Sequence, residues 1–240
     1  MEDIKELQKR ILYKSTACVV VNKLKGEAVE GAAGGMVDLP KALSALLPGT
    51  ELVEAVHRLD VPVTGCALFA LTKDALVFLN DAFAGKNAAP VEKHYWAITE
   101  KPTCPLNKST NSGAELVHWI ETNTKKNKSF AYNENAPGRK KASLRYRITG
   151  EGENYLFLEI ELLSGRHHQI RAQLAKEGLR IKGDLKYGAK RSEKGGGIRL
   201  HARSLSFPDP FKKNDKIRVT ANPPEPDNLW QSMINIMAKD

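Results

Sequence analysis

Short apolar runs separated by polar turns dominate the first third of the chain. Residues 17–21 form an apolar, β-branched run that predicts a buried strand, and residues 66–71 predict another. Thr72 then predicts the N-cap of a helix, and Gly85 predicts its end. Between them apolar residues recur at helical spacing, at Ala75, Leu79, Ala82 and Phe83.

The rest of the chain alternates mainly as strands. Strands are expected at 92–99, 143–149, 155–162, 199–207 and 217–219. In the third of these, one face is expected to meet the core, with Leu156, Leu158, Ile160 and Leu162. Residues 168–177 predict a helix with Ile170 and Leu174 on one stripe and Gly178 at its end, and 227–239 predict a closing helix.

Polar segments mark the connections. Residues 101–113 predict a loop, 123–128 a basic hairpin tip, 133–141 a mobile basic loop, and 192–197 a glycine-rich loop. The glycine-rich segment lacks the G-x-x-x-x-G-K-[ST] pattern of a phosphate-binding loop. Because no repeat or low-complexity segment divides the chain, residues 1–240 are expected to form one continuous α+β unit.

Composition adds a partner class. The 240 residues include 37 Lys and Arg against 28 Asp and Glu, a formal charge of +9, which favours a polyanion such as nucleic acid. No apolar stretch is long enough for a bilayer, so no membrane partner is expected. No secretory signal is visible, and the three cysteines, Cys18, Cys66 and Cys104, form no metal or disulfide pattern, which fits the cytoplasm.

Two short motifs contain several charged and titratable side chains of the kinds used in catalysis and phosphate binding. The first is His57-Arg58-Leu59-Asp60, where Pro62 and Gly65 predict a turn that presents the carboxylate. The second is residues 165–171, with the sequence Gly-Arg-His-His-Gln-Ile-Arg. Taken singly, either is a common surface pattern of charged residues. Together they predict one carboxylate inside a basic, phosphate-binding cleft.

Several reaction classes lose support. A glycosidase needs a second carboxylate, and Asp60 has no obvious partner nearby in the sequence, although a partner from elsewhere in the chain stays open. A zinc deaminase needs H-x-E and P-C-x-x-C, and a serine hydrolase of the elbow type needs G-x-S-x-G; none occurs. The adjacent His167 and His168 are expected to point to opposite sides of their element, so no shared metal is predicted.

A single carboxylate among arginines remains. Arg171 near Asp60 would lower the pKa of that carboxyl and keep it ionised, as a nucleophile or a base. Tyr95 offers a face on which a nucleobase can stack, although a strand tyrosine packed in the core is the plainer interpretation.

These residues, in this order, resemble the RluA family of RNA pseudouridine synthases over about residues 11–210. The resemblance rests on Ile11-Leu12-Tyr13, Val19 to Lys23, His57 to Asp60, Lys93-His94-Tyr95, Gly165 to Arg171, Gly183-Asp184, Tyr187-Gly188 and Leu200-His201-Ala202. It implies a long mixed, mostly antiparallel sheet with flanking helices and a central active cleft. It also implies a catalytic domain without the small RNA-binding domain that precedes it in many relatives.

The resemblance implies that uridine becomes pseudouridine, by breaking the N1–C1′ bond and rebuilding it through C5, with no cofactor and no metal. Asp60, Tyr95 and Arg171 would be catalytic, as nucleophile or base, stacking residue and cation. Arg58 would fill the space left by the flipped uridine. A further set would contact RNA: His57, Arg166, His168 and Lys23. The substrate is expected to be ribosomal RNA, with transfer RNA as the alternative, and the enzyme a monomer.

Four residues depart from the family pattern. Val63 stands where a threonine is usual, Leu24 where a proline is usual, and Gln173 and Arg180 where a histidine and a proline are usual. Two other readings therefore stay open: a basic RNA-binding protein without activity, favoured by Val63, and a different nucleotide-acting enzyme on the same scaffold.

Overall fold

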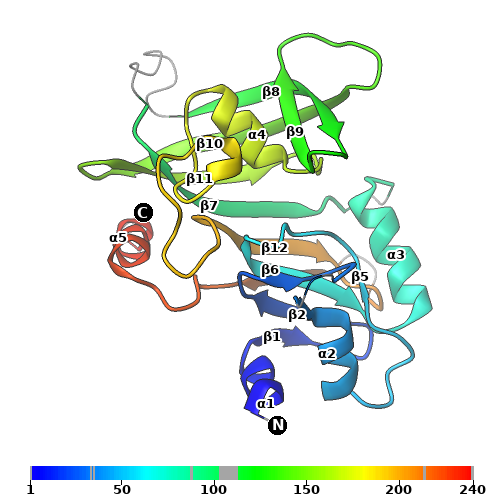
Figure 1. Ribbon diagram of the computed structural model, residues 1–240. Coiled ribbons are helices and arrows are strands. Elements are labelled where there is room, and N and C mark those ends of the chain that lie inside the picture. The colour runs from blue at the N-terminus through cyan, green and yellow to red at the C-terminus, as the bar shows by residue number, and fades with distance from the viewer. Residues whose placement is uncertain are drawn as a thin grey trace. The chain divides into compact units, whose positions relative to one another are not determined.

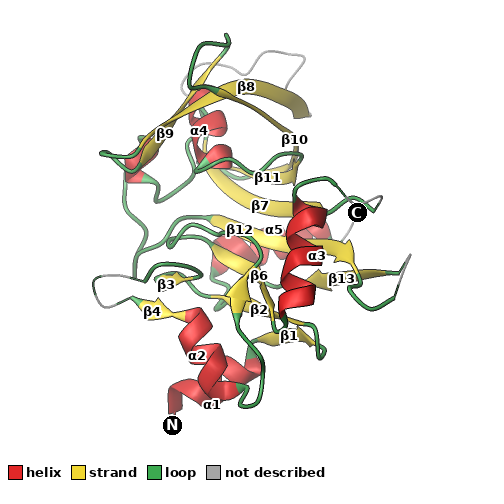
Figure 2. Cartoon of the chain, turned by 90° about the vertical axis from the view of Figure 1, so that its right-hand side faces the viewer, coloured by secondary structure: helices red, strands yellow, loops and turns green. Residues whose placement is uncertain are grey.

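The structure is a computed structural model that describes residues 2–32, 34, 36–86, 89–102, 113–212 and 215–238. The chain divides into two compact units. Unit 1 comprises Met1–Lys93 and Ala202–Pro224, and unit 2 comprises His94–His201 and Glu225–Asp240. Figures 1 and 2 show the helices and strands of both. The expectation of one continuous catalytic domain over 1–240 stays a prediction.

Unit 1 holds a sheet in the order β1-β2-β6-β12-β13, with β5 paired to β6. These strands are β1 (Ile11–Lys14), β2 (Cys18–Lys23), β5 (Glu54–Ala55), β6 (Thr64–Ala70), β12 (Leu200–Pro208, in this unit from Ala202) and β13 (Lys216–Thr220). The pairs β1–β2, β2–β6, β5–β6 and β12–β13 are antiparallel. A separate short parallel pair joins β3 (Glu27–Ala28) and β4 (Val37–Asp38).

The described residues of unit 1 include the helices α1 (Glu2–Lys9), α2 (Leu39–Leu46) and α3 (Lys73–Phe83). The predicted start of α3 is confirmed, since the Thr72 side chain accepts from the Ala75 backbone. Its apolar face packs into a core with β2, β6, β12 and β13 that includes Cys18, Leu68 and Leu79. The apolar run of β2 is buried on both faces, which explains why it is continuous rather than alternating.

The strands of unit 2 form a sheet in the order β7-β11-β10-β8-β9, and each of these neighbouring pairs is antiparallel. Its strands are β7 (Glu92–Glu100, in this unit from His94), β8 (Gly113–Asn123), β9 (Lys128–Tyr132), β10 (Lys140–Glu151) and β11 (Tyr155–Leu162). The bounds expected for β11 are confirmed, and Leu156 to Leu162 alternate into the core as predicted. The tip between β8 and β9 is the predicted hairpin at 123–128.

Helices cover both faces of the sheet in unit 2. Helix α4 (Gln169–Lys176) reaches one face, where Gln173 donates to the carbonyls of Leu116 and Ala142. Helix α5 (Asn228–Met237) packs Trp230 and Met233 against the other face. A 3-10 turn, η2 (Leu185–Tyr187), follows α4. The expected α+β class with mostly antiparallel strands is confirmed.

Two sequence expectations fall on residues outside this description. The predicted loop at 101–113 lies mostly there, because residues 103–112 are not described, and Cys104 lies there with it.

Helices α1 and α2 were not predicted from the apolar pattern. For α2 a signal was present, because Asp38 caps it by accepting from the Lys41 backbone, and Pro40 lies in its first turn.

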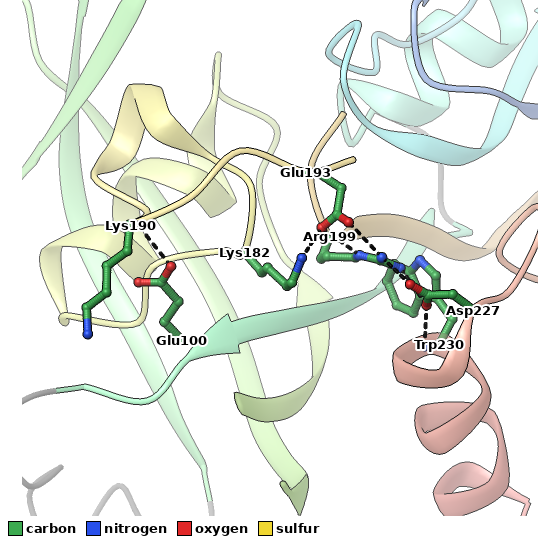
Figure 3. Close-up of polar contacts among 7 residues, drawn as sticks. All are labelled: Glu100, Lys182, Lys190, Glu193, Arg199, Asp227 and Trp230. Carbon is green, nitrogen blue, oxygen red and sulfur yellow. Dashed lines mark hydrogen bonds and ion pairs between the residues drawn. The ribbon is translucent and has the colours of Figure 1, made fainter. Parts of the chain in front are cut away.

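A cluster of charged residues fixes the start of α5 in unit 2 (Figure 3). Both carboxylate oxygens of Asp227, the N-cap of α5, accept from the Arg199 guanidinium, which also bonds Glu193. Burial acts to raise the pKa of Glu193 and of Asp227. The hydrogen bonds and charges of Arg199, and of Lys182 at Glu193, outweigh it, so both pKa values lie below their ordinary ones.

Acid is therefore expected to weaken unit 2 at this cluster. A carboxyl whose pKa is lower folded than unfolded adds stability above its unfolded pKa, and that stability is lost as the pH falls through the folded pKa. The melting temperature should be steady near neutral pH and fall below the ordinary values of 4.5 for Glu and 3.8 for Asp. Asp227→Asn keeps a capping oxygen but loses the charge, so its melting curve should depend less on pH. Identical pH dependence in both proteins would contradict this assignment.

Candidate active site

Asp60 lies on a tight turn between β5 and β6 in unit 1. The Val63 backbone donates to the Asp60 carbonyl at 3.0 Å, closing the turn. Gly65 follows at a φ of +113°, and a Cβ there would lie 2.3 Å from the carbonyl oxygen of Ala202. Only glycine fits such a close approach with a positive φ. The predicted turn is confirmed, and its backbone is held from both sides.

The side chain of Lys23 holds this turn through hydrogen bonds to its backbone. It is fully buried, and its ammonium donates to the carbonyls of Leu24 at 2.9 Å, Val61 at 3.1 Å and Val63 at 2.6 Å. Burial lowers the pKa of Lys23 to about 8, while the charges of Glu27 and Asp60 act in the opposite direction. The expected contact of Lys23 with an RNA phosphate is wrong, because the side chain has no exposed surface and spends its donors on backbone carbonyls.

Replacing Lys23 with methionine should loosen the turn that carries Asp60. The change keeps most of the side-chain volume but takes a donor from the Leu24 and Val63 carbonyls. Leaving buried acceptors without their donor costs about 1–3 kcal/mol. The melting temperature and the turnover number should both fall, with little change in the Michaelis constant. Lys25→Met at the exposed neighbour is the control. A Lys23→Met protein with normal melting and turnover would show that the turn holds itself.

His57 and Arg58 differ in exposure although they are adjacent. The Nε2 atom of His57 accepts from the Leu68 backbone at 3.2 Å, and its ring stacks on Phe83 with centroids 5.1 Å apart. Burial, and then the charge of Lys93, lower the pKa of His57 to about 3. The neutral ring, with Nε2 accepting, offers an Nδ1–H donor rather than a cation, and the predicted RNA contact of His57 stays a prediction.

The Arg58 side chain, by contrast, is 68% exposed, and its Nε lies 3.8 Å from a carboxylate oxygen of the exposed Glu30. A pair this long between two exposed side chains contributes little to stability. Arg58 can therefore exchange this partner for an incoming anion or base.

Two departures from the family pattern have a structural account. The backbone of Leu24 donates to Glu27 at 2.7 Å, a hydrogen bond that a proline cannot make. Glu27 in turn forms a bidentate ion pair with Arg10. Val63 is buried, and its backbone carries the contacts of the turn on both sides. The missing hydroxyl at Val63 therefore leaves the turn's backbone contacts intact.

In unit 2, Arg171 forms a buried, bidentate ion pair with Asp184. Its Nε donates at 2.7 Å and its Nη2 at 2.9 Å to the two carboxylate oxygens, and both residues are at most 5% exposed. The guanidinium also lies over the ring of Tyr187, 5.0 Å from its centroid. The planar fork of arginine suits both contacts. Asp184 and Tyr187 therefore fix Arg171, and both belong to segments that carry the family resemblance, Gly183-Asp184 and Tyr187-Gly188.

Tyr95 lies on the side of the unit 2 sheet that α4 covers. It pairs with Ile160 across β7 and β11, so the two side chains share a face. Ile160 in turn pairs with Tyr146 of β10, and Leu144 in that strand pairs with Leu116, whose carbonyl accepts from α4. Tyr95 is 6% exposed, as the plainer core interpretation expected. The structure thus brings Tyr95 and Arg171 to one face of unit 2.

The histidine pair in unit 2 corrects a sequence expectation. His167 and His168 do not point to opposite sides; their rings stack with centroids 3.9 Å apart. The reason is the backbone of His168, which has a φ of +51° and sits at the N-cap of α4. Regular alternation assumes a repeating backbone, and this residue breaks it.

Both histidines secure neighbouring segments. His167 bonds Ser129 and Asn127 at the β8–β9 hairpin, and His168 Nδ1 lies 3.0 Å from the Tyr187 hydroxyl. His168 is 8% exposed, and its predicted contact with RNA stays a prediction. Arg166 is exposed and donates to the Lys141 carbonyl, so its predicted RNA contact stays a prediction.

The candidate residues thus form two groups, one in each unit. Unit 1 carries Lys23, His57, Arg58 and Asp60, and unit 2 carries Tyr95, Arg166, His168 and Arg171. The pairing of Asp60 with Arg171 stays a prediction. Among the described residues, no three His, Cys, Asp or Glu side chains are grouped to hold a metal ion. In the same part of the chain, every helix is too short or too polar to cross a membrane.

Comparison with known proteins gives a consistent result. The family model described as RNA pseudouridylate synthase matches residues 17–176, which include Asp60, Tyr95 and Arg171. Ribosomal large subunit pseudouridine synthase C of Vibrio parahaemolyticus is 27% identical over 219 residues, covering 88% of this chain. Mitochondrial RNA pseudouridine synthase 4 of Arabidopsis thaliana is 30% identical over 193 residues, covering 74% of this chain. The chain spans 64% and 40% of these two relatives.

Solved structures agree on the fold. Human RNA Pseudouridylate Synthase Domain Containing 4 superposes with a TM-score of 0.73 and 22% identity, covering 99% of this chain and 96% of that one. Human RNA Pseudouridylate Synthase Domain Containing 1 gives a TM-score of 0.69 and 23% identity, covering 94% and 86%.

Proposed function

Since this chain belongs to the RNA pseudouridylate synthase family, we propose that it isomerises specific uridines in structured RNA to pseudouridine. The observation that carries the proposal is the family match over residues 17–176, which contains the rigidly held turn of Asp60. We propose ribosomal RNA as the substrate class, because the bacterial relatives are named for the large ribosomal subunit. Transfer RNA is the alternative.

Each residue takes one role in this proposal. Asp60 acts as the nucleophile or base, and the buried ammonium of Lys23 holds the backbone of the turn that carries it. Tyr95 stacks on the uracil, and Arg171 supplies the cation that pairs with Asp60. The reaction breaks the N1–C1′ bond, rotates the uracil and joins C5 to C1′. The C5 proton leaves and N1 ends protonated, so substrate and product have the same composition.

Arg58 completes the proposal. Extracting a uridine from its stack costs a few kcal/mol. The exposed guanidinium of Arg58, with its long contact to Glu30, is available to fill the vacancy and offset part of that cost.

We further propose a reducing compartment, the cytoplasm, and a monomer. In support of the compartment, both described cysteines are free thiols buried in unit 1. Burial raises the pKa of Cys18 to about 11 and that of Cys66 to about 12, which disfavours the reactive thiolate. Sedimentation of the purified protein tests the oligomeric state.

Mapping of the product tests the function. The protein is incubated separately with ribosomal RNA and transfer RNA from a strain that lacks the gene, and pseudouridine is mapped chemically at each nucleotide. New pseudouridine at one or a few positions of ribosomal RNA is the expected result. Modification of transfer RNA alone would replace the substrate class. RNA that binds but gains no pseudouridine in either pool would favour the inactive RNA-binding protein.

A further inference from the structure

The glycine-rich segment 188–197 of unit 2, here called the basic loop, is attached to the protein at two points (Figure 3). Near its start, the Lys190 backbone donates to a carboxylate oxygen of Glu100 at 2.9 Å. In its middle, the Glu193 carboxylate receives the Lys182 ammonium at 2.5 Å and the Arg199 guanidinium at 2.9 and 2.8 Å. A loop with three successive glycines is thus held by Glu100 at the end of β7 and by Lys182 and Arg199.

Lys182 and Arg199, which bind the loop, are themselves fixed by further contacts. The backbone of Lys182 donates to the Ile98 carbonyl in β7, and its carbonyl accepts from the Arg199 backbone. The Arg199 guanidinium binds Asp227 at the start of α5 and lies 5.7 Å from the Trp230 ring centroid. A Cβ at Gly183 would lie 2.9 Å from the Cβ of Glu193, so the two segments are in close contact. The loop therefore has a fixed support.

The basic loop exposes its positively charged side chains and turns its negatively charged side chain inward. Its residues 190–194 read Lys-Arg-Ser-Glu-Lys, and the three cations are exposed whereas the glutamate is turned inward. The side chain of Glu193 is 10% exposed and is already neutralised by two cations. The outward face of this short segment therefore presents three positive charges. Gly195, Gly196 and Gly197 follow at φ values of +75° to +80°, without side chains to cover the backbone.

We propose that the basic loop binds phosphates of the substrate RNA, as a contact additional to those of the target uridine. This inference rests on the proposed function, which makes RNA the substrate. A loop held in place before binding loses less conformational entropy when it binds than a free one does. A membrane surface fits less well, because the loop carries no exposed apolar side chain to insert into lipid.

The first test neutralises the outward charges. A protein with Lys190→Gln, Arg191→Gln and Lys194→Gln should bind a ribosomal stem-loop RNA at least about tenfold more weakly. The slope of log affinity against log salt should become shallower by about 2, since each lost phosphate contact removes about 0.7. The control carries Lys5→Gln, Lys14→Gln and Lys41→Gln in unit 1, which lowers the net charge equally. A control that is weakened as much as the loop variant would overturn the proposal.

The second test separates local attachment from overall charge. Glu193→Gln makes the protein more positive by one charge, so binding by net charge alone would become tighter. The proposal expects the opposite, several-fold weaker binding, because the loop loses its inner attachment. Thermal melting checks that unit 2 stays folded. If Glu193→Gln unfolds it, Glu100→Gln loosens the other attachment and should weaken binding in the same direction. Tighter binding in a folded Glu193→Gln protein would overturn the proposal.

The outcomes also separate this inference from the proposed function. Normal RNA affinity in the triple loop variant, with wild-type pseudouridine formation, would overturn the loop assignment alone. Weakened RNA binding in that variant, with no pseudouridine formed by the wild type in any RNA, would keep the loop and remove the function. Vesicles of phosphatidylserine and phosphatidylcholine serve as the rival polyanion. Loop-dependent binding to them that is tighter than to RNA would overturn the choice of partner.

Discussion

Asp60→Asn is expected to reduce pseudouridine formation to background, a loss of at least about a thousandfold. The amide has nearly the shape of the carboxylate but acts neither as nucleophile nor as base at neutral pH. The turn should survive, because its closing hydrogen bond uses the carbonyl of Asp60 and Lys23 holds the carbonyls of Val61 and Val63. Activity should therefore disappear from a folded protein.

Tritium release from uridine-labelled RNA measures the activity. Thermal melting measures whether the variant is folded, and RNA affinity measures whether it still binds its substrate. Asp74→Asn, at an exposed position in the first turn of α3, is the control with the same charge change. Turnover by a pure Asp60→Asn preparation would remove Asp60 from the chemistry. Loss of both activity and folding would show instead that the carboxylate is needed to balance the buried charge of Lys23.

Arg171→Lys is expected to lower kcat/KM by about tenfold to a hundredfold. A lysine keeps the charge but cannot form both hydrogen bonds to Asp184 in one plane or lie flat over Tyr187. A hydrogen bond to a charged group contributes about 1.5–3 kcal/mol, which gives this range. The melting temperature should fall as well, because both residues of the pair are buried.

Arg145→Lys is the matched control, since Arg145 pairs with Glu115 on the exposed side of β10 in the same unit. Its kinetics should stay normal. Asp184→Asn should reproduce part of the loss in kcat/KM if Asp184 positions Arg171 for the reaction. A lower melting temperature with unchanged kcat/KM in Arg171→Lys would mean that this arginine serves only the fold of unit 2.

Where backbone and side-chain patterns are regular, the fold followed from the sequence. The alternation of β11 and the cap of α3 were predicted to the residue, because solvent exposure has the same period as the backbone there. The short elements β3, β4 and β5 were missed, since two residues carry no period. Helix α2 was missed although Asp38 and Pro40 signalled it.

The candidate site was predictable in its members and less so in their roles. Asp60 was located by its flanking turn residues, Pro62 and Gly65. The burial of Lys23 could not be predicted, because its partners are backbone carbonyls, which leave no trace in residue identity. The stacking of His167 on His168 depends on one residue with a positive φ, and sequence periodicity cannot reveal that.

Neither compact unit is a continuous stretch of chain, and this has a consequence for how the protein is made. The thiol of Cys66 in β6 lies near the Arg203 carbonyl of β12, 137 residues later, and near that of Val219 in β13, 153 residues later. Unit 1 therefore cannot finish its sheet until the chain as far as β13 has left the ribosome. Closing such long loops is slow and entropically costly. A nascent chain that stops near residue 200 would expose the edge of β6, and a fragment cut at residue 93 would lack the strands that complete its core.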